Sequence, residues 1–362
     1  MAEMIVPVDV VIAVHTPTRP IARAVASVLD GNAEHARLTL VCHNVGVEQI
    51  QPLLEPAHRE QITWLEHHDG TPSASGPFNV GMRAAPGDFV SIMGSDDTVQ
   101  PGAIASWLHR ARQTGADCVM TRLAIGSTAR RVPTPPTRLL RRQVRLTDVV
   151  RDRLSYRSAP LGLVSTRVRD RLGAELVEGL PVGGDVPYVT RLWCETKVAV
   201  DGTGPAYVIG EDARDRVTYA PRPVDIEVGF VRHLVGQPWF TAYPELVRTA
   251  VATKLLRIHL FGVVLNRGDP TWWTPPERQA LADVVADVLV AAPRAADPLS
   301  VADHRLIEAM QNVDVDAQVL IQRATDRRRH GRPTTVIPKR LTQIGHREAP
   351  PRFMAASWVA SR

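Results

Sequence analysis

The sequence has few of the residues that hold small cross-linked folds together. Its 362 residues include only three cysteines, which lie far apart and form no CxxC pair. This excludes a disulfide framework and a cysteine-rich zinc site, and it favours a reducing compartment. No apolar run reaches the roughly 18 residues that a membrane-spanning helix needs. The first apolar stretch contains Pro7 and Asp9 and has no basic start, so we expect no signal peptide and a cytoplasmic location.

Motifs that identify several common enzyme classes are also missing. The phosphate-binding glycine patterns GxGxxG and GxxxxGK(S/T) do not occur, and neither do HExxH and GxSxG. Aromatic residues make up only 5% of the chain, and none interleave with basic residues in a stripe. We therefore expect no nucleic-acid partner.

The net charge of +5 is unevenly distributed along the chain. Residues 118–147 contain seven arginines and no acidic residue, and residues 323–362 carry a net charge of +8, which leaves −10 for the remainder. Such basic segments are either solvated surface or a contact for an anionic partner. We expect the basic tail to allow peripheral contact with an anionic membrane surface or a polyanionic acceptor.

Apolar runs alternate with helix-like segments in the first two thirds of the chain. Strands are predicted at 8–14, 38–44, 62–68, 88–94, 117–125, 160–166 and 206–210. Helices are predicted at 21–29, 79–85 and 102–115, near Thr147, and after Gly183-Gly184. Strands separated by connections of helix length predict a parallel, doubly wound α/β sheet.

Beyond about residue 225 the pattern becomes helical. Long helical stretches are predicted at 245–265, 276–292 and 300–312. We therefore expect an α/β domain at residues 1–225, a helical domain at 226–322 and a basic tail at 323–362.

Polar residues end the first four predicted strands. They are His15 and Thr16, His43 and Asn44, His67 to Asp69, and Ser95 to Asp97. Ligands of doubly wound sheets bind beyond the carboxyl ends of the strands, so we expect these residues to face one crevice. Carboxylates at its mouth, together with ligand phosphates, would suit Mg²⁺ or Mn²⁺. Alternatively, Asp97 or Thr98 only caps the helix after Pro101.

Four segments have the order and spacing of a known family. They are 8–29 (VDVVIAVHTPTRPIARAVASVL), 76–104 (GPFNVGMRAAPGDFVSIMGSDDTVQPGAI), 183–193 (GGDVPYVTRLW) and 213–218 (ARDRVT). Over about residues 5–225 the chain resembles family 2 glycosyltransferases with the GT-A fold. The resemblance implies a GT-A-like doubly wound mixed sheet with a C-terminal helical domain. It also implies a hexosyl- or N-acetylhexosaminyltransferase that uses Mn²⁺ or Mg²⁺ and a nucleotide-sugar donor, with UDP favoured over GDP or dTDP.

The resemblance also implies roles for single residues. Asp96 would take the metal-ligand position with Asp97 beside it, and Asp185 would take the position of the catalytic base. The residues implied to bind the donor are His15, Thr16, Arg19, Asn44, Asn79, Ser95 and Arg216. The chain departs from the family pattern where Gly94 and Gly184 replace acidic residues, and where His43 and Asn44 replace the acidic residues that read the base.

The chemistry of sugar transfer explains why these residue types are needed. Positive charge builds on the anomeric carbon, as in glycoside hydrolysis, while negative charge builds on the departing diphosphate. A divalent cation and an arginine stabilise that leaving group, and a carboxylate accepts the proton of the acceptor hydroxyl. A single-displacement, inverting route needs one base, which Asp185 could supply. Asp185 could instead be only an N-cap of the helix that follows.

Several further candidates have simpler interpretations. Arg19 could be surface, and Arg214 and Arg216 could pair with the neighbouring Asp212 and Asp215 instead of a diphosphate. His233 could be structural, and Trp272-Trp273 could cover the helical core instead of stacking on a sugar.

Two other functions stay open at this level. A nucleotidyltransferase would need a glycine-rich phosphate loop, which is absent. A non-catalytic module that binds a nucleotide sugar or glycan would fit the losses at Gly94 and Gly184. The acceptor of a transferase would be a hydroxyl group of a cell-surface polymer, a lipid-linked intermediate or a small molecule.

Overall fold

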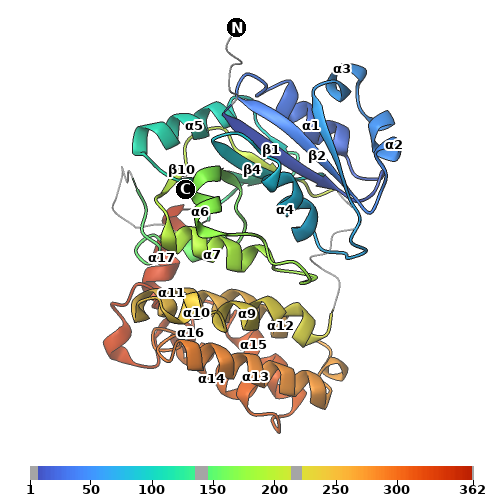
Figure 1. Cartoon of the computed structure of the whole chain (residues 1–362). Coiled ribbons are helices and arrows are strands. Elements are labelled where there is room, and N and C mark those ends of the chain that lie inside the picture. Colours follow the sequence, from blue (N-terminus) through green and yellow to red (C-terminus); the bar gives the residue numbers. More distant parts are fainter. Residues whose placement is uncertain (1–6, 135–145, 213–221, 361–362) are drawn as a thin grey trace.

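The computed structural model describes residues 7–134, 146–212 and 222–360, which form an α/β half and a helical half stacked on each other (Figure 1). A seven-stranded sheet in the order β10-β6-β9-β4-β1-β2-β3 forms the centre of the α/β half. Its strands are β1 (Val8–Val14), β2 (Ala36–His43), β3 (Ile62–His67), β4 (Phe89–Gly94), β6 (Cys118–Thr121), β9 (Gly162–Ser165) and β10 (Val198–Asp201).

Most strands of this sheet run parallel to one another. β1 pairs in parallel with both β2 and β4, and nearly all its residues are buried. A strand that is covered on both faces is apolar at almost every position, which is why the run VDVVIAV predicts it. Asp9 is the exception, and the Arg37 Nε atom donates to its carboxylate at 2.9 Å.

Strand β9 runs antiparallel to both of its neighbours, β4 and β6. Gly162 at the start of β9 lies beside Met120 near the end of β6, and Val164 lies beside Cys118 at the start of β6, so β9 runs from the carboxyl end of its neighbours toward their amino end. The parallel sheet that the strand pattern predicts is therefore wrong for β9, and the mixed sheet that the resemblance implies is confirmed. The short strand β10 was not predicted.

Helices cover both faces of the sheet (Figure 1). One face holds α1 (Ile21–Leu29) and α5 (Ala103–Thr114), and the other holds α4 (Ser75–Arg83), α6 (Thr166–Leu172) and α7 (Asp185–Glu195). The short helices α2 (Val47–Ile50) and α3 (Pro56–Arg59) lie between β2 and β3. Side chains alternate across a strand, so Ile12 packs with the first group and Val11 with the second.

A second sheet, in the order β5-β11-β7-β8, extends the α/β half. Its strands are β5 (Thr98–Val99), β7 (Leu123–Ile125), β8 (Arg130–Val132) and β11 (Tyr207–Ile209). The strand predicted at 117–125 is therefore two strands that belong to different sheets and are separated by Arg122. Strand β11 brings Tyr207 next to the end of β4, where its hydroxyl accepts a hydrogen bond from the Gly94 N–H at 3.1 Å.

In the described residues from 146 onward, turns and a short 3₁₀ helix, Leu154–Tyr156, stand where the sequence predicts a helix near Thr147. The Asp148 carboxylate accepts hydrogen bonds from the N–H groups of Val150 and Arg151. Such local side-chain bonds compete with the backbone bonds of a helix. Arg153 then adopts a positive φ of 55°, which is incompatible with a continuing helix.

From residue 222 the described chain is mostly helical, as the sequence predicts. The run predicted at 245–265 is one continuous helix with a π-helical segment, Leu255–Leu260, in its middle. The α-helices are α8 (Val224–Glu227), α9 (Gly229–Val235), α10 (Pro238–Thr241), α11 (Glu245–Lys254), α12 (Phe261–Leu265), α13 (Pro275–Ala291), α14 (Val301–Gln311) and α15 (Ala317–Asp326). Apolar side chains of these helices form one core. Val186 of α7 also belongs to it, so this core joins the two halves. Each described helix is too short or too polar to cross a bilayer.

The basic C-terminal segment folds back against both halves. It contains α16 (Pro333–Val336) and α17 (Pro350–Ala360). Between them, the buried Glu348 accepts hydrogen bonds from Arg153 of the α/β half at 3.1 Å and from Arg257 of the helical half at 2.7 Å. Removing one member of a buried ionic group typically costs about 3–5 kcal/mol. The segment is therefore anchored through Glu348.

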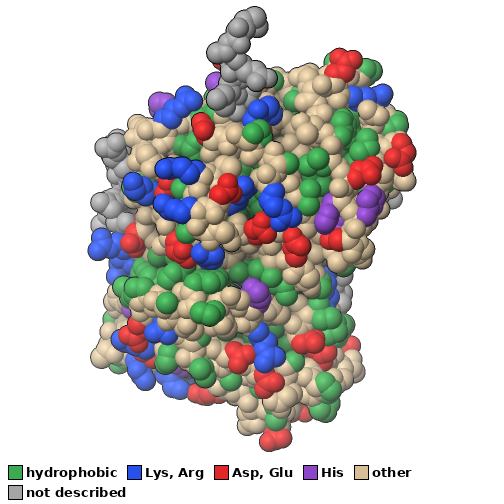
Figure 2. Space-filling model, viewed as in Figure 1, with side chains coloured by type: hydrophobic (Ala, Val, Ile, Leu, Met, Phe, Trp, Pro, Cys, Tyr) green, Lys and Arg blue, Asp and Glu red, His purple; other side chains and the backbone are tan. Residues whose placement is uncertain are grey.

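The molecular face shown in Figure 2 carries acidic and basic side chains interspersed on both halves. Hydrophobic side chains gather on this face in a band at the level of α10 and α11, where the two halves meet. Positive charge forms no continuous stripe on this face.

Candidate functional site

Two adjoining cavities open at the carboxyl end of the central sheet. The smaller has a volume of about 380 Å³ and the larger of about 590 Å³. Residues that line both cavities, and so form the wall between them, are Pro72, Ala74, Phe78 and Gly94.

The smaller cavity collects most residues that the sequence assigns to the donor. Those that line it are His15, Arg19, Asn44 and Ser95, which follow β1, β2 and β4. The predicted metal ligand Asp96 lines the same cavity. Thr16 does not line this cavity, and its Oγ atom lies 3.1 Å from that of Thr18. Arg214 and Arg216 lie outside the described residues.

Asp96 lies at the rim of the smaller cavity in an ion pair with Arg19. Its Oδ2 atom is 3.1 Å from Arg19 Nη1, and both side chains are largely buried. Arg23 donates to the backbone carbonyl of Asp96 at 2.8 Å and pairs with Asp212 on its other side. Two arginines thus contact Asp96, and each of them also pairs with a carboxylate.

Asp97 is held in a different way from Asp96. The Tyr207 hydroxyl donates to Oδ2 of Asp97 at 2.5 Å, and the Gly210 N–H donates to Oδ1 at 2.9 Å. Burial and the adjacent carboxylate raise the pKa of Tyr207 well above its usual value, so the phenol stays protonated and remains a donor. Asp97 therefore fastens β11 to the end of β4.

The contacts of Asp97 explain why a glycine stands at position 94. A Cβ atom on Gly94 would lie 2.7 Å from Oδ2 of Asp97, closer than non-bonded atoms approach. An acidic side chain at this position would also place a like charge beside Asp97. Glycine at position 94, where the chain departs from the family pattern, thus leaves room for the Asp97 carboxylate.

The acidic residues fit a divalent cation only in combination with a phosphate ligand. In residues 7–134, 146–212 and 222–360, no group of three or more His, Cys, Asp or Glu side chains could hold a metal alone. Mg²⁺ is commonly held by one or two carboxylates plus substrate phosphates. Asp96 borders the cavity and can supply one carboxylate, whereas both oxygens of Asp97 already accept hydrogen bonds.

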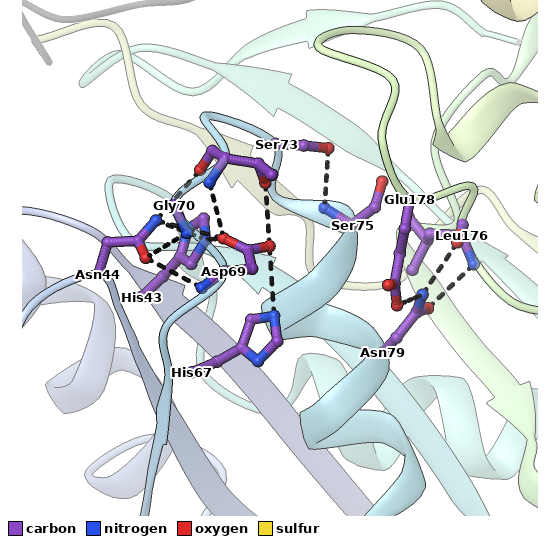
Figure 3. Close-up of polar contacts among 11 residues, drawn as sticks. His43, Asn44, His67, Asp69, Gly70, Ser73, Ser75, Asn79, Leu176 and Glu178 are labelled. Carbon is purple, nitrogen blue, oxygen red and sulfur yellow. Dashed lines mark hydrogen bonds and ion pairs between the residues drawn. The ribbon is translucent and has the colours of Figure 1, made fainter.

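Asn44 lines the smaller cavity, but its side chain is engaged by the loop that follows β3 (Figure 3). Its Oδ1 atom accepts from the N–H groups of Asp69 and Gly70, at 3.2 and 3.0 Å. Its amide nitrogen donates to the Thr71 carbonyl at 3.1 Å. The amide is therefore committed to holding this loop, and it has little capacity left to read a base.

Two histidines hold the same loop through Asp69 (Figure 3). The Asp69 carboxylate lies 2.8 Å from Nε2 of His43 and 3.3 Å from Nε2 of His67. Partial burial opposes its ionisation, yet hydrogen bonds from His43 and Thr71 hold the pKa of Asp69 well below its usual range. Because Pro72 follows in the wall between the cavities, this cluster sets the shape of both.

Asn79 is buried and lines neither of the two cavities. Its amide nitrogen donates to the Leu176 carbonyl at 2.9 Å and to Glu178 at 2.8 Å, and its oxygen accepts from the Leu176 N–H at 3.0 Å (Figure 3). The N–H of the next residue, Val177, donates to the carbonyl of Gly184. Asn79 therefore positions the loop that leads to α7.

Asp185 lies across the dividing wall, in the larger cavity, as the first residue of α7. The N-cap of this helix is Gly184, so Asp185 is not itself the cap. Burial raises the pKa of Asp185 to about 6, and the positive charge of Lys254 and the first N–H groups of the helix oppose this shift. A carboxylate with this pKa is a suitable general base near neutral pH.

Gly184 has no room for a side chain. A Cβ atom there would lie 2.5 Å from the carbonyl oxygen of Val177 and would also strike the Ser75 hydroxyl. Glycine at this position, in place of the acidic residue of the family pattern, lets the start of α7 approach α4 closely.

We expect Gly184→Ala to destabilise the fold by about 1–3 kcal/mol, because overpacking forces the backbone near Val177 to move. The measurement is the free energy of unfolding in urea. Gly268→Ala is the matched control, since a Cβ there meets nothing within 4 Å. A stability of Gly184→Ala equal to that of the control would contradict the close packing described.

The larger cavity also contains residues that the sequence patterns did not indicate. They are Tyr207 of β11, Phe230 of α9 and His259 of the π-helical segment. Each is a single residue from a distant part of the chain, so no local motif could have identified it. His233 lies outside both cavities and contacts Gln237, and Trp273 is buried in the helical core.

Comparisons with known proteins agree with this architecture. Residues 9–172 match the family model described as glycosyl transferase family 2. No curated protein matches the chain.

Solved structures of S. aureus TarS resemble the whole described fold. TarS 1–349 superposes with a TM-score of 0.68 at 14% identity, over 90% of this chain and 93% of that one. Its complex with UDP-GlcNAc superposes with a TM-score of 0.70 at 12% identity. This chain also aligns with a longer TarS structure, and the alignment covers 55% of the length of that protein. The likeness extends through the helical half, so the GT-A-like sheet with a C-terminal helical region is confirmed.

Proposed function

Since the chain is a glycosyltransferase of family 2 with a GT-A fold, we propose that it transfers a sugar from a UDP-sugar donor to a hydroxyl group, with metal dependence and inversion. One observation carries the proposal. Two cavities meet at a shared wall, with the Asp96 carboxylate in one and the Asp185 carboxylate in the other. This is the arrangement that a direct displacement between two bound substrates requires.

The smaller cavity would hold the nucleotide diphosphate. Arg19 and Asp96 stand at its rim, and a diphosphate bound there would give the Arg19 guanidinium a bidentate partner. S. aureus TarS has been solved with UDP and with UDP-GlcNAc, which supports a uridine nucleotide and an N-acetylhexosamine or hexose as the transferred sugar. His15 and Ser95 line the same cavity and complete the donor site.

A divalent cation, Mn²⁺ or Mg²⁺, would neutralise the charge that develops on the leaving diphosphate. Asp96 is the residue that would hold it, and Asp97 would contribute by keeping the end of β4 in place. Arg19 would share the stabilisation of the leaving group. Three other residues assigned to the donor would act only by positioning the protein backbone around it. They are Thr16, Asn44 and Asn79.

Asp185 would accept the proton of the attacking hydroxyl in the larger cavity. One base is sufficient because the hydroxyl attacks the anomeric carbon directly and inverts its configuration. Many residues that line this cavity are apolar, which would keep water away from the reacting hydroxyl. The acceptor would be a hydroxyl of a glycan, a lipid-linked intermediate or a small molecule, and the basic segments would serve a polyanionic acceptor or a membrane surface at a cytoplasmic location.

The test is a thermal-shift screen with UDP-, GDP- and dTDP-sugars, each with and without Mn²⁺. A ligand present at about 100 times its Kd adds about 2.7 kcal/mol of stability. We expect UDP-GlcNAc with Mn²⁺ to raise the Tm most, and the same mixture to release UDP slowly by hydrolysis.

Other outcomes of this screen would contradict the proposal. Stabilisation without any turnover, in the presence of acceptor candidates, would identify a binding module. Release of pyrophosphate instead of UDP would identify a nucleotidyltransferase.

A further inference from the structure

Lys254, at the end of α11, is a buried lysine of the helical half. Its side chain is only 2% exposed. Its Nζ atom lies 2.7 Å from Nε2 of His259, and no described Asp or Glu forms a direct ion pair with it. Burying an ammonium group without a carboxylate partner is costly, so its retention at this position needs a reason beyond packing.

The π-helical segment is what brings Lys254 and His259 together. An α-helix turns about 100° per residue, so residues five positions apart would lie on different faces. The i→i+5 bonding of residues 255–260 places them on one face instead. Burial and the nearby Lys254 charge keep the pKa of His259 well below its usual value, so the imidazole is neutral and its Nε2 can accept from Lys254.

The same group of residues contacts the loop that carries Asp185. The Phe230 ring meets His259 edge-on, with ring centres 4.8 Å apart. Gly183 packs against that ring so closely that a Cβ would lie 2.5 Å from Cγ of Phe230. The positive charge of Lys254 also acts on Asp185 through space. The helical half therefore supports the start of α7 both by packing and by charge.

We propose, on the basis of the proposed function, that Lys254 is a positioning residue for Asp185. His259 holds the Lys254 ammonium in place, and the positive charge of this ammonium keeps the Asp185 carboxylate ionised in the acceptor cavity. The helical half would then supply a working part of the transfer site.

The other charged side chains that line the larger cavity each have a partner close by. Arg222 lies 3.6 Å from Glu227, and the Asp97 carboxylate accepts from Tyr207. His259 is neutral. No described Asp or Glu forms a direct ion pair with Lys254, and the positive charge of this buried side chain favours the ionised form of Asp185.

The directions of the pKa shifts agree with this role. Burial raises the pKa of Asp185 to about 6 and lowers that of Lys254 to about 7, and the charge of each residue opposes the shift of the other. Removing the positive charge therefore raises the pKa of Asp185 further. Less of the base is then ionised at a given pH.

Lys254→Met keeps the length of the side chain and removes its charge. With UDP release from UDP-GlcNAc and Mn²⁺ as the readout, we expect the acid limb of the kcat profile to move to higher pH by about 1 unit. The KM for the donor should not change, because the donor cavity is separate. Lys197→Met, at an exposed lysine outside both cavities, is the control and should keep the wild-type profile.

If kcat of Lys254→Met falls equally at every pH and the acid limb does not move, Lys254 acts only through packing and the inference is overturned. Should Lys254→Met fail to fold, His259→Leu removes the acceptor that holds the ammonium, and the limb should move in the same direction; an unmoved limb there has the same consequence. A wild-type protein that releases no UDP defeats the proposed function together with this inference. An active protein that Asp185→Asn inactivates, but whose profile Lys254→Met leaves unchanged, defeats only the role of Lys254.

Discussion

Asp185→Asn should lower kcat for sugar transfer by roughly 10²–10⁴-fold, the usual contribution of a positioned general base. Asparagine has the shape of aspartate but cannot accept the proton of the acceptor hydroxyl. Donor binding should be unchanged, because Asp185 lines the larger cavity and the predicted donor residues line the smaller one. The measurements are single-turnover transfer and titration with UDP-GlcNAc and Mn²⁺.

The wild-type enzyme should also show the ionisation of this base in its pH profile. The pKa of Asp185 is raised to about 6, and the base works only when ionised. Activity should therefore rise with pH through about 6 and fall away below it, and the residual rate of Asp185→Asn should lack this limb.

A matched control for this substitution is available at another helix start. Asp225 is exposed in the first turn of α8 and lines neither cavity, so Asp225→Asn should transfer at the wild-type rate. Normal transfer by Asp185→Asn would exclude this residue as the base. Loss of donor binding would show instead that Asp185 supports the donor cavity.

Asp96→Ala should remove the part of UDP-sugar binding that depends on Mn²⁺. This carboxylate borders the smaller cavity beside Arg19, and among the described residues that line the cavity it is the one acidic side chain. Without the cation, charge on the departing diphosphate is poorly stabilised, so kcat/KM should fall by roughly 10²-fold or more. Calorimetric titration with UDP, with and without Mn²⁺, separates the two contributions to binding.

Asp97→Asn is the control that distinguishes the two adjacent carboxylates. Asp97 accepts hydrogen bonds from Tyr207 and Gly210, so its replacement should destabilise the fold by about 1–3 kcal/mol and leave the Mn²⁺ dependence of binding intact. Undiminished Mn²⁺-dependent binding in Asp96→Ala would refute the metal assignment. The reverse pattern between the two variants would transfer the role to Asp97.

Departures from the family pattern have a common physical basis in the structure. Gly94 leaves space for Asp97 to reach Tyr207, and Gly184 leaves space for α7 to approach Ser75. Both glycines are therefore explained by packing between segments far apart in the sequence. They are not by themselves signs of a lost activity.

Local patterns determined the parts of this fold that depend on burial alone. Strand β1 is apolar at almost every position because both of its faces are covered, and α1 starts after Pro20 for reasons contained in its own sequence. The position of the crevice also followed, since the carboxyl ends of parallel strands lie at one edge of a sheet. Asp96 could be placed there from its position after β4.

Tertiary structure alone decided the direction of β9 and the roles of side chains whose partners are distant in sequence. Asn79, which the resemblance assigns to the donor, contacts Leu176, and Asp97, which it places beside the metal, contacts Tyr207. Lys254 carries no motif, yet it acts on Asp185 across the boundary between the halves. The reason is physical: secondary structure follows from the burial of neighbouring residues, whereas the function of a polar side chain depends on which distant group the fold brings within its reach.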